Sequence, residues 1–224
     1  MLYTALALLP ALLLMLWLYT RDTLHQEPKR AVYRLYLLGA AIVLPAGLIE
    51  RQMLNSGFGH NGLRAVFMTA FFVAGLVEEF LKASIVDRAA FQPGLMKSPL
   101  DSIVYSGAVA LGFATVENIL YVTSSGFGTA ILRSVTAVPA HLMFGIVMGT
   151  AFARHIWLHQ SRAWAYVLPA MAHGIYDTFA LTNSWVGDGL LFIYLIALLE
   201  WSLRRLDWAS NLSTRLFVQR RSAW

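Results

Sequence analysis

Ionisable side chains lie inside the apolar stretches of this chain, where they are costly. Glu78, Glu79 and Lys82 fall within the apolar run 65–86, which is long enough to cross a bilayer as one helix of about 20 residues. A charged residue at the centre of a membrane helix costs roughly 2.5–3.5 kcal/mol. Because folding does not require these groups, we expect them to serve a function.

Three more apolar segments carry ionisable groups, which are Glu117, His141, His173 and Asp177. His173 and Asp177 are four residues apart and share one face of a helix. Two roles fit this pair: Asp177 orients the imidazole, or both residues bind one metal ion. Since unpaired charges in lipid are costly, we expect the ionisable groups of four helices to meet in one site.

Carboxylates together with two histidines are suited to hydrolysis. We expect Glu78 or Glu79 to act as the general base that activates a water molecule. Lys82, four residues after Glu78, is expected to pair with a carboxylate and keep it ionised. The remaining groups are expected to hold either a metal ion, Zn²⁺ by its ligand preference, or the water and the developing oxyanion: Glu117, His141, His173 and Asp177.

The same residues also suit a transporter, in which buried carboxylates and histidines relay protons or bind a cation. No internal repeat with matching broken helices, as in many transporters, is evident in the sequence. A receptor or scaffold does not need this many buried charges. Bound zinc with chelator-sensitive cleavage would favour the protease, whereas uptake driven by a pH gradient would favour transport.

The composition indicates a membrane protein built of helices. The 224 residues are 58% hydrophobic and only 13% charged, whereas soluble domains carry about 25% charged residues. Apolar segments of about 20 residues are typical of helices rather than of barrel strands of about 10 residues. We predict an all-α, polytopic transmembrane bundle with about seven spans: 2–19, 31–49, 65–86, 102–123, 127–153, 163–181 and 190–203.

Basic residues predict the orientation of the bundle. They concentrate in alternate loops and in the tail, which places the N-terminus outside and the C-terminus in the cytoplasm. The net charge of +5 is thus a topology signal, and we expect no nucleic-acid partner. Residues 1–206 form the predicted transmembrane domain, and 207–224 form a basic cytoplasmic tail suited to anionic lipid. The absence of cysteine excludes disulfides, thiol catalysis and Cys-ligated metal.

Local sequence features predict bends and caps. Pro45 and Pro139 predict kinks in their helices, and Asp101 is expected to cap the start of the next helix. Glu50 and Arg51 are expected to form an ion pair at the membrane interface. Small residues that allow close helix approach occur in the two central segments: Ser106, Gly107, Ala110, Gly145 and Gly149.

The ordered motifs resemble those of a known family. Glu78-Glu79-Phe80-Leu81-Lys82 resembles the EExxK motif of the PrsW family of intramembrane proteases. The stretch from Phe113 to Glu117 resembles its FxxxE motif, and the stretch from His173 to Asp177 resembles its HxxxD motif. His141 stands where the family has a histidine in the intervening helix. The resemblance covers residues 75–177, with the motifs in the family's order.

The resemblance implies a multi-pass bacterial metalloprotease of the cell inner membrane. Its substrate would be a membrane-anchored protein, and the family's characterised role is first-site cleavage of an anti-sigma factor. The wider group includes type II CAAX prenyl endopeptidases, with EExxxR and FxxxH motifs and a Glu/His-activated water without metal. This chain has Glu117 in place of their histidine and Lys82 in place of their arginine. The wider resemblance implies a CAAX-type prenyl protein endopeptidase as an alternative function, and these two differences argue against the metal-free mechanism.

Overall fold

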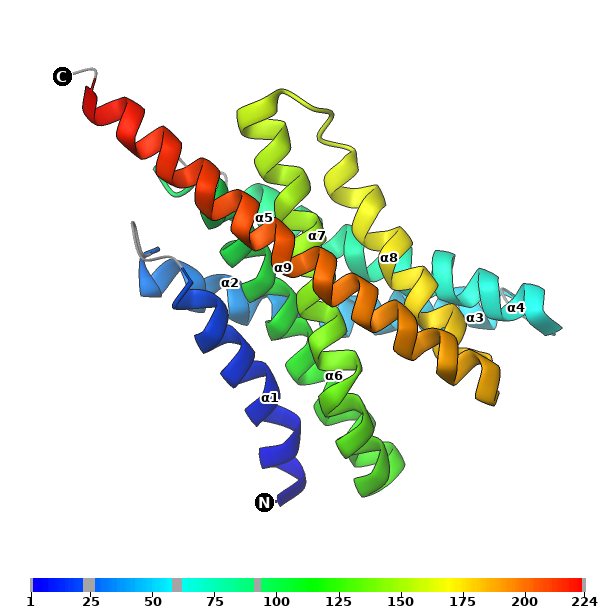
Figure 1. Ribbon diagram of the computed structural model, residues 1–224. Coiled ribbons are helices and arrows are strands. Elements are labelled where there is room, and N and C mark those ends of the chain that lie inside the picture. The colour runs from blue at the N-terminus through cyan, green and yellow to red at the C-terminus, as the bar shows by residue number, and fades with distance from the viewer. Residues whose placement is uncertain (1, 22–26, 58–61, 91–93, 223–224) are drawn as a thin grey trace.

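The computed structural model describes residues 2–21, 27–57, 62–90 and 94–222, and it confirms the predicted all-α bundle (Figure 1). Within these residues every regular element is a helix. In chain order the elements are α1 (Leu2–Tyr19), α2 (Lys29–Ala41), α3 (Val43–Asn55), α4 (Gly62–Met68), the π-helix η1 (Thr69–Gly75), α5 (Leu76–Ala90), α6 (Pro99–Val135), α7 (Ala137–Leu158), α8 (Trp164–Leu181) and α9 (Trp185–Ser222).

Four helical segments in the described part of the chain are long and apolar enough to cross a membrane. They are Lys29–Asn55, Pro99–Ser124, Ile131–Leu158 and Trp185–Gln219, and the shorter apolar helix Leu8–Tyr19 adds to them. Each overlaps a predicted span. The total of about seven spans and their orientation stay predictions.

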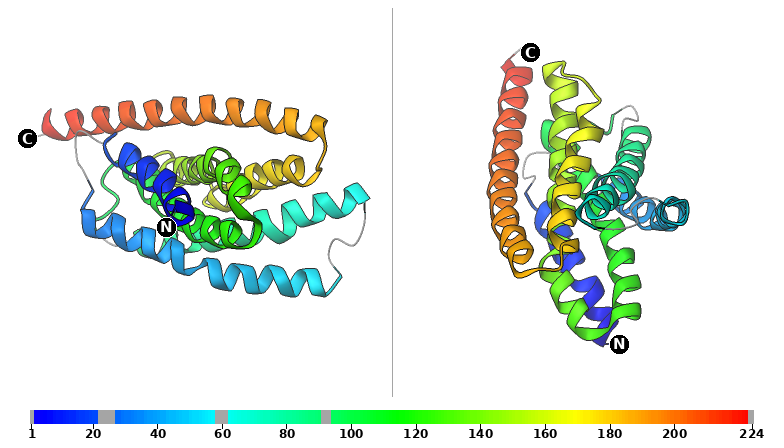
Figure 2. Two further views of the ribbon diagram at one scale, coloured as in Figure 1. Left: turned by 90° about the horizontal axis from the view of Figure 1, so that it is seen from below. Right: turned by 90° about the vertical axis from the view of Figure 1, so that its right-hand side faces the viewer.

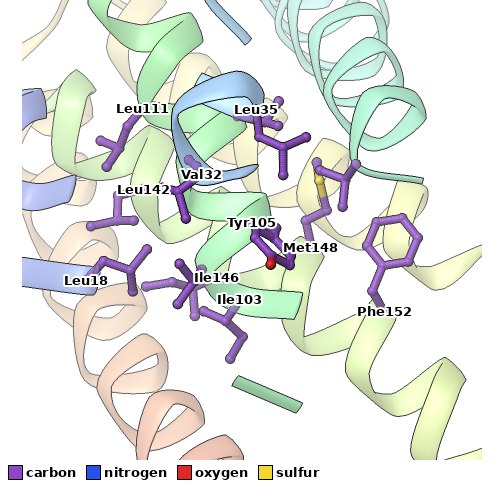
Figure 3. Close-up of a cluster of buried hydrophobic side chains, with 14 of the residues drawn as sticks. Leu18, Val32, Leu35, Ile103, Tyr105, Leu111, Leu142, Ile146, Met148 and Phe152 are labelled. Atoms are coloured by element: carbon purple, nitrogen blue, oxygen red, sulfur yellow. The ribbon is translucent and has the colours of Figure 1, made fainter. Parts of the chain in front are cut away.

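The helices are arranged around α6 and α7 at the centre. Figure 2 shows α9 along one side of the molecule and α2 with α3 along the other, while α1, α6, α7 and α8 lie between them. A cluster of buried side chains from α1, α2, α6 and α7 fills the interior, including Leu18, Leu35, Tyr105 and Met148 (Figure 3). The residues that carry chemistry lie on α5 to α8, beside this apolar core.

Close contact between α6 and α7 depends on small residues, as predicted. A Cβ atom at Gly149 would lie 2.6 Å from the backbone oxygen of Ser102, and one at Gly145 would lie 2.9 Å from the Ala110 Cβ. The two backbones can approach this closely only because these glycines have no side chain. This contact fixes the position of α7, which carries His141, against α6, which carries Glu117.

Both predicted proline bends are confirmed as breaks between helices. α2 ends at Ala41 and α6 ends at Val135, four residues before Pro45 and Pro139, and the single residues Ile42 and Thr136 separate these helices from the next ones. Proline cannot donate a hydrogen bond, and its ring clashes with the carbonyl group four residues earlier. α2 and α6 therefore end at that carbonyl, and a new helix begins.

The start of α6 also follows the prediction. The Ser98 Oγ accepts a hydrogen bond from the Asp101 amide, and the Asp101 carboxylate accepts one from the Ser98 amide. These reciprocal bonds form a capping box, which satisfies backbone donors that the helix leaves free.

The structure differs from the predicted spans at three places. The span predicted at 65–86 is divided into α4, η1 and α5. The helix predicted to begin at residue 127 begins instead at Ala137, because 127–135 belong to the last part of α6, beyond a non-helical Gly126 with φ of 84°. The membrane-length segment Ile131–Leu158 includes the end of α6 and all of α7. The span predicted at 190–203 is part of the 38-residue α9. Residues 207–222 continue that helix, and the predicted role of this tail at the lipid surface is not tested by the fold.

Candidate active site

The two glutamates and the lysine occupy one turn of α5, directly after the π-helix η1. A Cβ atom at Gly75 would lie 2.8 Å from the backbone oxygen of Ala170 and 3.0 Å from the Gly174 amide nitrogen. Gly75 therefore lets the start of α5 pack directly against the α8 backbone. Short π-helical segments are often found at functional sites, and here the segment delivers α5 to the helix that carries His173.

Lys82 is the central residue of the site. Its ammonium group lies 2.9 Å from Glu78 Oε2, 2.7 Å from Glu79 Oε1 and 3.1 Å from His141 Nδ1. These contacts use all three N–H donors of the ammonium group. The nitrogen also lies 4.0 Å from the centre of the Phe113 ring. The predicted pairing of Lys82 with a carboxylate is confirmed.

Both glutamates reach the same ammonium group, although they point about 100° apart on the helix. Glu79 is three residues before Lys82 and Glu78 is four residues before it. These two spacings lie on either side of the lysine's own direction, so both carboxylates can bend towards it. All three side chains are buried, which places two carboxyl groups and one ammonium group in the interior of the bundle.

The two histidines contact different groups through Nδ1, but each contacts a carboxylate through Nε2. The Nδ1 atom of His141 faces Lys82, and the Nδ1 atom of His173 lies 3.0 Å from Glu79 Oε1. Each Nε2 atom faces another carboxylate: His141 Nε2 lies 2.9 Å from Glu117 Oε2, and His173 Nε2 lies 3.4 Å from Asp177 Oδ2. Because an ammonium group only donates, His141 Nδ1 accepts, and its Nε2–H donates to Glu117.

Four buried side chains offer donor atoms that could hold a metal ion: Glu78, Glu79, His141 and His173. One donor atom from each lies within 4.8 Å of the others. Carboxylate oxygens and imidazole nitrogens are established zinc ligands. In addition, Glu79 Oε2 is buried with no hydrogen-bond partner among the described residues, and each histidine has a carboxylate at its far nitrogen, as metal-binding histidines usually do. The donor set therefore fits a divalent ion, which would take the place of the Lys82 hydrogen bond at His141 Nδ1.

This group and the ligand set expected from the sequence share only the two histidines. The expected ligands Glu117 and Asp177 face the outer nitrogens of the imidazoles, away from the four-donor centre. The imidazole of His141 spans the distance between Lys82 and Glu117. All six candidate residues of the sequence thus belong to one connected network. Glu78, Glu79 and the two histidines form its four-donor centre, and Glu117 and Asp177 contact the far nitrogens of the histidines.

A cavity of about 210 Å³ opens beside this network. Glu78, both histidines, Glu117 and Asp177 line it, whereas Glu79 does not. Phe144 stacks on the His173 ring at 4.8 Å between ring centres and forms part of the apolar support behind it. A water molecule or a peptide group in the cavity can therefore contact Glu78, whereas Glu79 does not line this space.

Two residues of the cavity were not recognised in the sequence as part of the site. Arg133 donates to Glu117 Oε2 at 2.7 Å and stacks on Tyr121. Glu50, which we expected to pair with Arg51, lines the cavity, and no ion pair joins these two neighbours in the described chain. The expected Glu50–Arg51 pair is therefore wrong: adjacent residues point about 100° apart on a helix, and the side of α3 that carries Glu50 faces the cavity.

An all-helical bundle with membrane-length apolar helices and a buried Glu/Glu/His/His group defines a class, that of membrane-embedded hydrolases with a potential metal centre. The sequence matches the family described as PrsW family intramembrane metalloprotease over residues 27–201. The chain belongs to this family, and it is an intramembrane protease that acts on a protein substrate.

Named relatives agree with this assignment. The chain is 33% identical to Protease PrsW of Geobacillus kaustophilus over 206 residues, which cover 90% of this chain and 89% of the relative. It is 32% identical to Protease PrsW of Clostridioides difficile over 222 residues, with 95% and 93% covered. It is 36% identical to that of Oceanobacillus iheyensis over 172 residues, with 75% and 78% covered. No solved structure matches the chain.

Proposed function

We propose that Glu78 is the general base of this protease and that Glu79, His141 and His173 bind a zinc ion. The observation that carries this assignment is the position of the two glutamates: Glu78 lines the cavity, whereas Glu79 lies behind it, in contact with Lys82 and His173. Catalytic zinc sites keep three protein ligands and one open position. A bound zinc ion supplies Lewis-acid activation of water at neutral pH.

The protein groups around this centre have distinct roles. Glu78 accepts the proton of the attacking water and later delivers it to the leaving amine. Glu117 and Asp177 hold the imidazoles of His141 and His173 in one orientation, as outer-shell carboxylates do. Lys82 offsets the charge of the two buried glutamates. This assignment keeps all six residues expected from the sequence in the site.

The substrate is a membrane-anchored protein, and the protease acts in the bacterial inner membrane. We propose an anti-sigma factor as the physiological substrate, cleaved at its first site. Family membership supports this proposal, as does the position of the cavity between helices that include membrane-length apolar segments, where a freely soluble protein would reach it poorly. The prenyl-protein alternative is less favoured, because the site has Glu117 at the position where those enzymes have a histidine.

The experiment that tests this function combines metal content with cleavage. The purified protein, in detergent, would be analysed for bound metal by mass spectrometry and incubated with a single-span anti-sigma factor. We expect about one zinc per chain, and a fall in kcat of at least about 100-fold for Glu78→Gln. His173→Ala should lose both zinc and cleavage. Cleavage by both variants at the wild-type rate would refute the assignment, and metal-free wild-type protein that still cleaves would refute the zinc.

A further inference from the structure

Glu50 lies on the wall of the catalytic cavity, although it is far in sequence from the motif residues. Val43, Gly47 and Glu50 share one face of α3, and all three line the cavity. A Cβ atom at Gly47 would meet no other atom within 4 Å. The α3 wall thus leaves open space one turn before the Glu50 carboxylate, which is enough room for part of an incoming side chain.

Glu50 differs from the other carboxylates of the cavity in its partners. Glu78 is paired with Lys82, Glu117 with Arg133 and His141, and Asp177 lies beside His173. In contrast, Oε1 of Glu50 is buried and has no hydrogen-bond partner in the part of the chain that the structure describes. Such an oxygen loses its hydration without compensation, so it is a group that a ligand would stabilise.

The cations of the site are already engaged. Lys82 uses its three donors on Glu78, Glu79 and His141. Arg133 pairs with Glu117 through its Nη2 atom and lies over the ring of Tyr121, and although its Nε atom has no hydrogen-bond partner among the described residues, no ion pair joins it to Glu50 there. Among the described residues that line the cavity, no further lysine or arginine is present to neutralise Glu50. A cation that pairs with it must therefore come from a molecule that enters the cavity.

We propose that Glu50 is a specificity-determining residue that binds a lysine or arginine side chain of the substrate, close to the peptide bond that is cleaved. This role rests on the proposed protease function, because the ligand is the peptide being hydrolysed. The position of α3 is suited to substrate binding. Only Val43 and Ala46 of this helix are buried, so α3 can adjust its position when a substrate peptide binds. An ion pair in this sheltered position favours a cationic residue over a neutral one of similar length.

The test uses the full-length protein in nanodiscs and a series of single-span peptides. Each peptide carries Lys, Gln or Glu at one position near the cleavage point. For the wild type we expect kcat/KM to be about tenfold higher with Lys than with Gln at one position, the size expected of a partly sheltered ion pair. In Glu50→Gln this Lys/Gln ratio should fall to about one, and in Glu50→Lys the preference should shift to Glu at that same position.

Glu200→Gln is the matched control, because Glu200 is exposed on α9 and pairs with Arg204. It should keep the wild-type ratio. A Lys/Gln ratio that is the same in the wild type and in Glu50→Gln would overturn the proposal, and would mean that Glu50 binds no substrate cation. If the wild type cleaves no peptide, this result contradicts the proposed protease function and not the role of Glu50. Anisotropy measurements of labelled Lys and Gln peptides bound to wild type and Glu50→Gln then decide the Glu50 proposal by themselves.

Discussion

At the scale of single residues, Lys82 connects the two glutamates of α5 with His141 of α7. Its ammonium group contacts α5 carboxylates on one side and the α7 imidazole on the other, and it is fully buried. A buried charge network of this kind is strongly destabilised when one partner is removed, because the remaining charges lose their compensation.

We therefore predict that Lys82→Met destabilises the metal-free protein by about 3–5 kcal/mol. Methionine keeps much of the side-chain length but leaves Glu78 and Glu79 without a cation. Thermal unfolding in detergent, after dialysis against a chelator, measures the change. Lys97→Met is the control, because Lys97 is exposed and its replacement should change stability by no more than about 0.5 kcal/mol. Equal unfolding temperatures for wild type and Lys82→Met would contradict the prediction.

Arg133 acts on the site through Glu117 and the far nitrogen of His141. Outer-shell partners of this kind typically contribute 10–100-fold to metal affinity or activity, by order of magnitude. We predict that Arg133→Met weakens zinc binding and lowers kcat by about tenfold, and that Arg133→Lys restores part of both because it keeps the charge.

Zinc affinity from competition with a chelating dye measures this effect apart from cleavage. Arg204→Met removes an exposed arginine that pairs only within α9 and should leave zinc affinity unchanged. If Arg133→Met bound zinc as tightly as the wild type and cleaved at the same rate, Arg133 would have no positioning role.

The sequence identified seven ionisable residues of the site, Lys82 included, because each stands out in an apolar helix. It could not identify Arg133 or Glu50 in the same way. Both lie near helix ends, where charged residues are common at a membrane interface. A charged residue at such a position therefore does not by itself indicate a functional site. Their roles depend on the breaks at Ile42 and Gly126, which set where the flanking segments lie.

At the scale of helices, Gly75 is the point at which α5 meets α8. A methyl group there would lie within 3.0 Å of backbone atoms of Ala170 and Gly174, and backbone cannot move aside as a flexible side chain can. We predict that Gly75→Ala separates the two helices and lowers kcat by about 100-fold, as expected for a shift of about 1 Å between catalytic groups.

The matched control is Gly189→Ala on α9, where an added Cβ atom would meet nothing within 4 Å. Alanine is favoured over glycine inside a helix, so this variant should retain full cleavage and be slightly more stable. Assays of both variants at equal zinc content separate a change in geometry from a loss of metal. Full activity of Gly75→Ala would show that the α5–α8 contact does not position the site.

The positions of the helices could be predicted from the sequence better than their internal irregularities. The helix breaks at Pro45 and Pro139 could be predicted, because proline has no amide donor. The π-helix Thr69–Gly75 could not be predicted, because its residues are almost all apolar. A uniformly apolar segment has no periodic pattern from which the wider helical turn could be recognised. The turn of α6 at Gly126, in contrast, falls in the gap between the predicted spans 102–123 and 127–153.

At the scale of the whole molecule, the length of α9 bears on how the bundle sits in a bilayer. Its 38 residues correspond to about 57 Å of helix at roughly 1.5 Å per residue, whereas the hydrocarbon core is about 30 Å thick. The helix must tilt strongly or extend beyond the membrane. Figure 2 shows it running along one whole side of the molecule, and its last third carries the basic residues of the predicted cytoplasmic tail.

The predicted orientation determines on which side of the membrane the substrate is cut. Glu50 lies near the end of α3, and Glu117 and Arg133 lie near the Gly126 turn of α6. With the N-terminus outside, both of these helix ends face the exterior, so the cavity would open towards the outer half of the bilayer.

Because the chain contains no cysteine, single cysteines can test this orientation in a clean background. Ser56→Cys, between α3 and α4, should react with a membrane-impermeant maleimide in intact spheroplasts. Ser161→Cys, between α7 and α8, should react only after the membrane is permeabilised. Both serines are exposed, so a difference in labelling reports the side of the membrane rather than burial. Labelling of both positions from the same side would refute the seven-span topology, and the reverse pattern would place the opening of the cavity, and hence the cut, towards the cytoplasm.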